Sequence, residues 1–230
     1  MSKVILYVHD AGVRAAAYEQ SAAQIARGLA GADIRMPVEP CLWGETQGAR
    51  YGREGRSLPE ETAAAAPQAA SRQRRDDILS NPASPLSADL LRYLARGDDI
   101  RGVVEQRVRD CGSGVVLFAH GLGGVAAVDL LVHKVLPQVH TLVTVGTAVP
   151  LLYELGALWS LPLGENLPLH FPRRWYNFYD RRDLQGCRAA PIFLGDAIDH
   201  EVSSGQPFPQ AHTAYFDNPA FWYKLKAVLA

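Results

Sequence analysis

The sequence has few cysteines and no long apolar run. Its three cysteines, Cys41, Cys111 and Cys187, are odd in number and widely spaced. They therefore predict neither a disulfide framework nor a paired-thiolate metal site. The first ten residues hold a short apolar run that ends at His9 and Asp10, which is too short for a signal-peptide core or a membrane span. We expect a cytoplasmic protein with no membrane-spanning segment, no metal site and no cofactor.

An excess of charge of either sign is also missing. The chain carries 23 Lys and Arg against 24 Asp and Glu, a net charge of -1, so no overall field would attract nucleic acid or an anionic membrane. With 48% hydrophobic residues over 230 positions, the composition is that of a folded globular protein. The length favours one domain spanning residues 1–230.

Short apolar runs alternate with helical patterns along the chain. β-Branched and aromatic residues predict strands at 3–8, 33–38, 115–118, 139–145 and 175–179. Apolar residues at helical spacing predict helices at 15–30, 125–136 and 218–229. The alternation predicts an α/β fold with a mostly parallel sheet flanked by helices.

Two long segments interrupt this alternation. Residues 40–59 are rich in glycine and read as a loop, followed by two or three arginine-bearing helices over 60–110. Residues 150–172 are rich in proline and leucine and read as irregular. Long irregular segments in compact domains often bind ligands, so we expect 40–110 and 150–172 to act as lids or pocket walls.

The clearest motif follows the strand at 115–118. It reads Ala119-His120-Gly121-Leu122-Gly123-Gly124 and leads directly into a helix. Such a turn lies at the carboxyl edge of a parallel sheet, where α/β proteins bind ligands. The motif resembles the nucleophile elbow, G-x-S-x-G, of the α/β-hydrolases, in their serine esterase and lipase-like branch. Here alanine replaces the first glycine, and Gly121 stands where the family has its nucleophilic serine.

The resemblance extends to other parts of the chain. The run His9-Asp10-Ala11-Gly12 after the first strand resembles the family's oxyanion loop, and Gly146 begins a segment like one that lines esterase pockets. These positions, with His120 and Leu122 on either side of Gly121, are the oxyanion and pocket residues that the resemblance implies.

The family places nucleophile, acid and histidine in this chain order. The resemblance therefore implies an acid at Asp183 or Asp180, of which we favour Asp183, and a base at His212.

Two departures from the family bear on activity. Gly121 has no side chain that His212 could activate. Asp10 would place a carboxylate near the developing oxyanion if it pointed inward, or it could cap the following helix. Asp10 is itself disfavoured as a nucleophile, because carboxylate nucleophiles in this fold occupy the elbow. Cys111 precedes the elbow strand and belongs to the opposite edge of the sheet.

Three hypotheses follow. The chain is a serine-hydrolase relative that has lost ester hydrolysis and binds a small apolar or acyl-type ligand, or a protein. Alternatively, it is a nucleophile knockout engineered from an active esterase, thioesterase or lipase. The third hypothesis is an enzyme that uses His212 as general base for lyase, cyclase or water-mediated chemistry.

Overall fold

The computed structural model describes residues 3–48 and 85–230, with the side chains of 85–87 left aside. Most of the loop predicted at 40–59 and the first part of the region 60–110 lie outside the described residues. Within them, six strands form one parallel sheet in the order β2-β1-β3-β4-β5-β6. They are β1 Val4–Val8, β2 Val38–Cys41, β3 Val115–His120, β4 Val139–Val145, β5 Trp175–Tyr179 and β6 Ala197–Glu201. The predicted parallel α/β architecture is confirmed.

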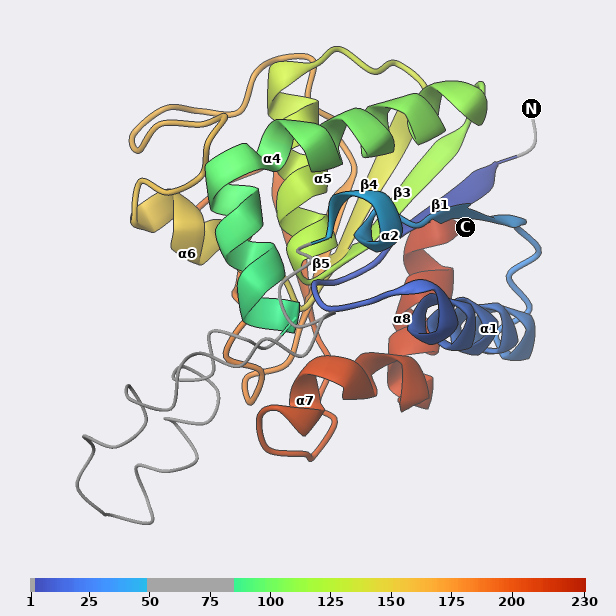
Figure 1. Ribbon diagram of the computed structural model, residues 1–230. Helices are drawn as coiled ribbons and strands as arrows, with labels where there is room; N and C mark the ends of the chain where they lie inside the picture. The colour runs from blue at the N-terminus through green and yellow to red at the C-terminus, as the bar shows by residue number, and fades with distance from the viewer. Residues whose placement is uncertain (1–2, 49–84) are drawn as a thin grey trace, which may run out of the picture.

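Helices cover both faces of this sheet (Figure 1). On one side lie α4 (Pro85–Asp110) and α5 (Leu122–His133), and on the other α1 (Ala15–Gly31) and α8 (Pro219–Leu229). The short helices are α2 Gly44–Gln47, α6 Val149–Glu154 and α7 Gln210–Thr213, with a 3-10 turn, η2, at Ala214–Asp217. All five β1 residues are buried because alternate side chains enter the two cores that these layers enclose.

Two strand predictions need correction. The second strand is Val38–Cys41, later than the predicted 33–38, because the chain is still closing α1 there: the Ile34 N–H donates to the Leu29 carbonyl. The last strand, Ala197–Glu201, is absent from the strands predicted above. It is a short edge strand paired with β5, and its acidic residues obscure the apolar pattern on which strand prediction depends.

The segment 150–172 begins with α6 and then runs beside α5. The Ser160 hydroxyl donates to Asp129 Oδ1 at 2.6 Å, and the guanidinium of Arg101 on α4 lies 4.0 Å from the centre of the Trp159 ring. These contacts fasten the segment to two helices, and its role as a pocket wall stays a prediction.

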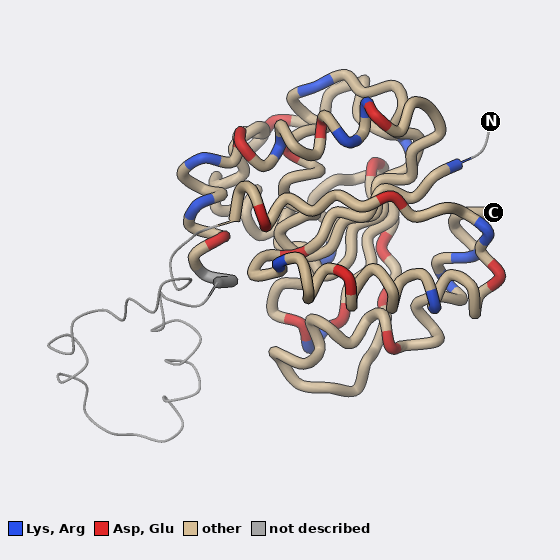
Figure 2. Tube along the Cα trace, turned by 45° about the vertical axis from the view of Figure 1, so that its right-hand side comes forward, with Lys and Arg blue, Asp and Glu red and all other residues tan. Residues whose placement is uncertain are grey.

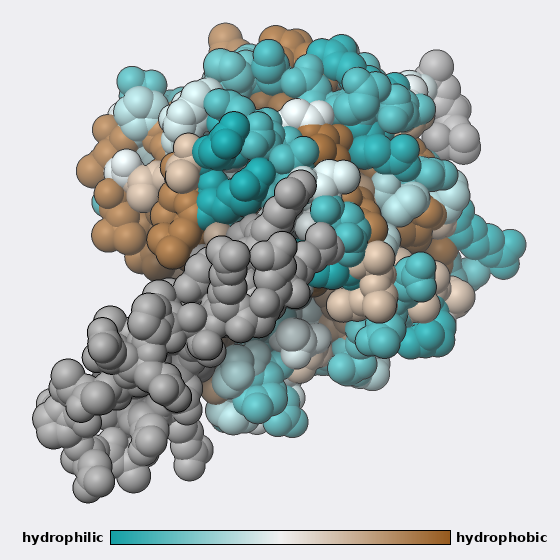
Figure 3. Space-filling view, in the orientation of Figure 1, coloured by the Kyte–Doolittle hydropathy of each residue, from teal (hydrophilic) through white to brown (hydrophobic). Residues whose placement is uncertain are grey.

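Surface residues divide into mixed charges and an apolar region. Lys and Arg alternate with Asp and Glu over much of the surface (Figure 2), as in the Arg109–Glu105 pair of α4 at 2.7 Å. Apolar residues gather over α6 (Figure 3), where Leu151 is 42% and Leu155 68% exposed. Among helices of the described ranges, none has both the length and the apolar character needed to cross a bilayer.

Candidate functional site

The elbow predicted from the motif is present in the structure. β3 ends at His120, α5 begins at Leu122, and Gly121 between them has φ 54°. Glycine adopts this left-handed backbone without the strain that a side chain would add. A Cβ built on Gly121 would lie only 1.9 Å from Asp10 Oδ1 and 2.2 Å from Asp10 Cγ. The turn is therefore that of an elbow, but the space of its side chain is already filled.

The group that fills this space is the Asp10 carboxylate. Asp10 follows β1 at the carboxyl edge of the sheet and is 5% exposed. Its Oδ1 accepts a 2.7 Å hydrogen bond from the Leu122 N–H, and its Oδ2 lies 2.9 Å from His212 Nε2. The alternative role as a helix cap is wrong, because α1 begins at Ala15 after Arg14 and has no side-chain cap.

His212 stands between two carboxylates. Its Nδ1 lies 2.9 Å from Asp183 Oδ2, opposite the contact of Nε2 with Asp10. Asp183 also accepts hydrogen bonds from the Tyr215 hydroxyl at 2.8 Å and from the Gln185 N–H at 2.9 Å. All polar atoms of this Asp10–His212–Asp183 cluster that face one another are thus paired.

Asp180, the other candidate acid, binds elsewhere. Its carboxylate accepts from the Arg182 N–H at 2.9 Å and from both the N–H and the hydroxyl of Ser204 at 2.7 Å. Its own N–H donates to the Tyr215 hydroxyl at 2.8 Å. Asp180 therefore holds the loop after β6, and Asp183 is the carboxylate beside His212.

Two predicted neighbours shape the space around His212. The His120 ring stacks on the His212 ring at 4.8 Å, and its Nε2–H donates to the His212 carbonyl at 2.9 Å. Gly146, which follows β4, has φ 55°, and a Cβ there would lie 2.8 Å from Asp183 Oδ2 and 3.3 Å from His212 Cε1. Only glycine lets the acid and the histidine approach β4 this closely.

His9 supports the loop from behind. Its ring stacks on Trp43 at 4.6 Å, its Nε2 accepts from the Gly44 N–H, and its Nδ1–H donates to the Asp10 carbonyl. Burial lowers the pKa of His9 to about 4, so the ring is neutral. Ala11 is buried beside it, at 8% exposure. The hydrogen bonds of His9 thus hold the backbone around Asp10 in place.

The electrostatics favour an ion pair at the elbow. Burial alone would lower the pKa of His212, but its hydrogen bonds with Asp10 and Asp183 outweigh burial and raise it to about 10. Burial alone would raise the pKa of Asp10, but His212 outweighs it and lowers that pKa to about 2. His120 stays neutral because burial and the charge of His212 lower its pKa to about 4. At neutral pH, His212 is an imidazolium held by two carboxylates.

One member of the site has no sequence signal. Tyr215 links the two acids, because its hydroxyl donates to Asp183 and accepts from the Asp180 N–H. It lies in the 3-10 turn before α8, and no motif marks it.

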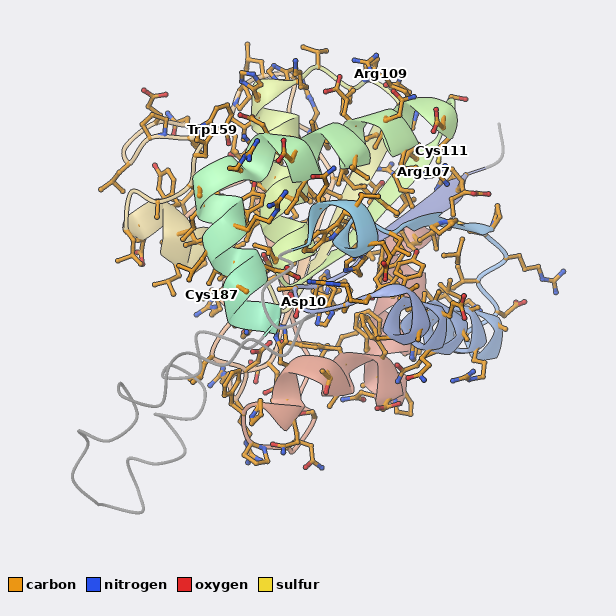
Figure 4. The ribbon with its side chains drawn as sticks, viewed as in Figure 1. Asp10, Arg107, Arg109, Cys111, Trp159 and Cys187 are labelled. Atoms are coloured by element: carbon orange, nitrogen blue, oxygen red, sulfur yellow. The ribbon has the colours of Figure 1, made fainter. Side chains whose placement is uncertain are left out.

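Cys111 lies at the end of the sheet opposite to Asp10 (Figure 4), beside a hollow of about 600 Å³ that Arg107 also lines.

Comparisons with known proteins support the fold. No family model and no curated protein matches the chain. Among solved structures, TT1662 from Thermus thermophilus superposes with a TM-score of 0.52 at 16% identity, covering 99% of this chain and 87% of that one. The esterase domain of a Rhodothermus marinus protein gives a TM-score of 0.41 at 16% identity, covering 99% and 84%. The superposition on TT1662 supports the fold, and the parallel sheet with its elbow is consistent with an α/β-hydrolase-like fold.

Proposed function

We propose that this chain is an α/β-hydrolase-fold protein that does not hydrolyse esters and acts by binding an apolar ligand or a protein. One observation carries the proposal: the Asp10 carboxylate occupies the place of the elbow side chain and contacts both the Leu122 N–H and His212 Nε2.

Each requirement of serine-type hydrolysis fails at this site. A nucleophile is missing, because Gly121 has no side chain. The base is already protonated at neutral pH, since the pKa of His212 is about 10. The Leu122 N–H, which is placed to stabilise an oxyanion, already binds a carboxylate oxygen. The second and third failures both arise from the Asp10 carboxylate, so a nucleophile at position 121 is of no use while that carboxylate stays in place.

The same contact weighs against both alternatives. If Gly121 were an engineered replacement, the parent protein would carry a serine at position 121. In the present arrangement, the Cβ of that serine would lie 1.9 Å from Asp10 Oδ1, which is an overlap. A general base at His212 would need a free lone pair on Nε2, but that nitrogen carries the proton shared with Asp10.

The surface supports a partner of apolar character. Besides Leu151 and Leu155 of α6, Trp159 is 54% and Leu163 61% exposed on the segment that follows. Exposed apolar residues grouped in this way are typical of surfaces that bind other molecules.

The test compares the wild-type protein with a His212→Gln variant. We expect no difference between them in turnover of p-nitrophenyl acetate or p-nitrophenyl octanoate, and no labelling by a fluorophosphonate reagent. Saturable turnover in the wild type that His212→Gln abolishes would overturn the proposal. Mass spectrometry of molecules released from the purified protein then tests the small-ligand class, because a stoichiometric apolar compound would assign a small ligand.

A further inference from the structure

Three segments of the chain meet around Tyr153, beneath the apolar region seen over α6 (Figure 3). The Tyr153 hydroxyl accepts a hydrogen bond from the Gly164 N–H at 3.0 Å and donates one to the Glu165 carbonyl at 2.9 Å. Its ring centre lies 5.2 Å from that of Phe193. The end of α6 is therefore held beside two segments that are distant in the sequence, one around residue 164 and one around residue 193.

Each of these three segments exposes a leucine and a carboxylate close together in the sequence. The pairs are Leu155 with Glu154, Leu163 with Glu165, and Leu194 with Asp196. In the described ranges, none of the three carboxylates takes part in an ion pair. Residues 149–172 and 189–197 contain no Lys or Arg. The exposed leucines thus lie among negative charges that nothing on these segments neutralises.

Arginines that border these segments are paired or lie elsewhere. The Arg101 guanidinium lies 4.0 Å from the centre of the Trp159 ring, is largely buried, and pairs with one aspartate of α4 and one of α5. Arg188 pairs with Asp199 at 3.6 Å. The arginines at 173 and 174 precede β5 and lie at the amino edge of the sheet, whereas α6 follows β4 at the carboxyl edge. Positive charge must therefore come from outside the chain.

We propose that this region binds a basic amphipathic helix of a partner protein. The Tyr153 surface, as we call the region, consists of Leu151, Leu155, Trp159, Leu163, Leu194, Glu154, Glu165 and Asp196. The inference rests on the proposed function and deepens it, because it names the chemistry of the protein partner. An amphipathic helix presents an apolar stripe with charges along its sides, so its apolar residues would cover the leucines while its Lys or Arg would meet the carboxylates.

The carboxylates disfavour two other occupants of the Tyr153 surface. An anionic bilayer would repel Glu154, Glu165 and Asp196. A second copy of the chain, docked about a two-fold axis, would bring the same carboxylates to both sides of the contact, where like charges oppose binding.

Trp159 provides a signal that is specific to this surface. It is 54% exposed, whereas Trp43, Trp175 and Trp222, the other tryptophans of the chain, are buried. The probe is a synthetic helix of about 18 Leu and Lys residues, with its leucines on one face at helical spacing. We expect saturable binding of one peptide per chain, measured by anisotropy of a labelled peptide, with a blue shift of the Trp159 emission.

Two sets of variants separate the apolar contacts from the charges. Leu155→Ser combined with Leu194→Ser should weaken binding at least about tenfold at every salt concentration. Neutralising the carboxylates, with Glu154→Gln, Glu165→Gln and Asp196→Asn together, should weaken binding about tenfold at low salt and abolish its salt dependence. Circular dichroism establishes that each variant is folded.

Matched controls lie on the opposite face of the sheet. Glu19→Gln on α1 removes an exposed carboxylate, and Tyr223→Ser on α8 removes an exposed apolar side chain. Neither should change the affinity for the Leu/Lys helix. A peptide of the same composition in scrambled order, and a helix with Glu in place of Lys, should bind at least about tenfold more weakly to the wild type.

Several results would overturn the inference. One is a wild type that shows no saturable binding of the Leu/Lys helix, or that binds the scrambled or the Leu/Glu peptide equally well. Another is a pair of surface variants that bind like the controls. Binding to phosphatidylglycerol vesicles that the leucine variant abolishes would assign a membrane instead, and a dimer in sedimentation that this variant dissociates would assign a second copy.

Peptide binding and ester turnover are measured separately. A failure of the helix to bind would leave the absence of hydrolysis, and an apolar small ligand, as the proposed function. Ester hydrolysis by the wild type would overturn that function and leave the peptide result unchanged.

Discussion

A serine introduced at Gly121 tests whether Asp10 is the obstacle to hydrolysis. The substitution Gly121→Ser would place a Cβ 1.9 Å from Asp10 Oδ1, so the carboxylate must leave its position. In the double variant, Gly121→Ser with Asp10→Gly, that space is free and the Leu122 N–H loses its present acceptor. We expect measurable hydrolysis of p-nitrophenyl acetate from the double variant and little from the single one.

The structure sets the size of both effects. A non-glycine residue at φ 54° costs about 1–3 kcal/mol, and expelling Asp10 from its buried pair costs about 3–5 kcal/mol. The single variant thus loses about 4–8 kcal/mol, a large part of the 5–15 kcal/mol that stabilises a typical domain. The double variant keeps the strain but leaves no displaced carboxylate. One oxyanion donor is worth about 10²–10³ in rate, so freeing Leu122 should give the double variant at least a hundredfold advantage.

The assay needs two further proteins. Asp10→Gly alone lacks a nucleophile and gives the background rate of the opened site. The double variant with His212→Ala removes the base and should return the rate to that background. Far-ultraviolet circular dichroism and urea unfolding establish that each variant is folded, so that a low rate is not mistaken for unfolding.

Two results would refute this reasoning. Strong hydrolysis by Gly121→Ser alone would mean that Asp10 moves aside easily and does not block the elbow. A folded double variant with no activity above its His212→Ala counterpart would mean that the elbow, the histidine and the donor no longer form a serine-hydrolase site.

Three other predictions concern stability. The pKa of folded His212 is about 10 against an ordinary 6.5, so the contribution of charged His212 to the free energy of unfolding is fully present below about pH 6.5 and disappears as pH rises to 10. Urea unfolding from pH 5 to 11 should show this decline in stability, and in Asp10→Asn the decline should end at a lower pH. Tyr215→Phe leaves the Asp180 N–H without its acceptor and removes a donor to Asp183, so we expect a loss of about 1–3 kcal/mol in urea unfolding, whereas Tyr223→Phe, at 77% exposure, should cost almost nothing. In Gly146→Ala the new Cβ would lie 2.8 Å from Asp183 Oδ2, whereas in Gly156→Ala, at a similar φ, the new Cβ meets open space. Gly146→Ala should therefore lower the thermal midpoint more than Gly156→Ala does. Equal losses would mean that only backbone strain matters.

Sequence patterns were sufficient where local chemistry decides the structure. The wholly apolar run at 115–118 and the β-branched run at 139–145 become central strands, since residues of these types suit a sheet that lies between two helical layers. The motif around Gly121 predicts the strand, the turn and the helix because glycine adopts the left-handed backbone of such a turn without strain.

Long-range contacts were beyond these patterns. Asp10 and His212 are 202 positions apart, and no periodicity indicates that a carboxylate from one end of the chain will reach a histidine from the other. The choice between Asp183 and Asp180 depends on how the turn after β5 places each carboxylate. The edge strand β6 was missed because its charged residues suit solvent on one side.

Because Asp10 overlaps any side chain at position 121, the order in which these two positions change affects whether each change is tolerated. Starting from an elbow that bears a serine, a stepwise route must lose that side chain before an aspartate can settle at position 10, because the two cannot occupy the same space. Once the aspartate is bound to Leu122 and His212, a return to serine at position 121 alone is destabilising. We therefore expect that hydrolysis, which we propose is absent from the wild-type protein, does not arise from Gly121→Ser alone.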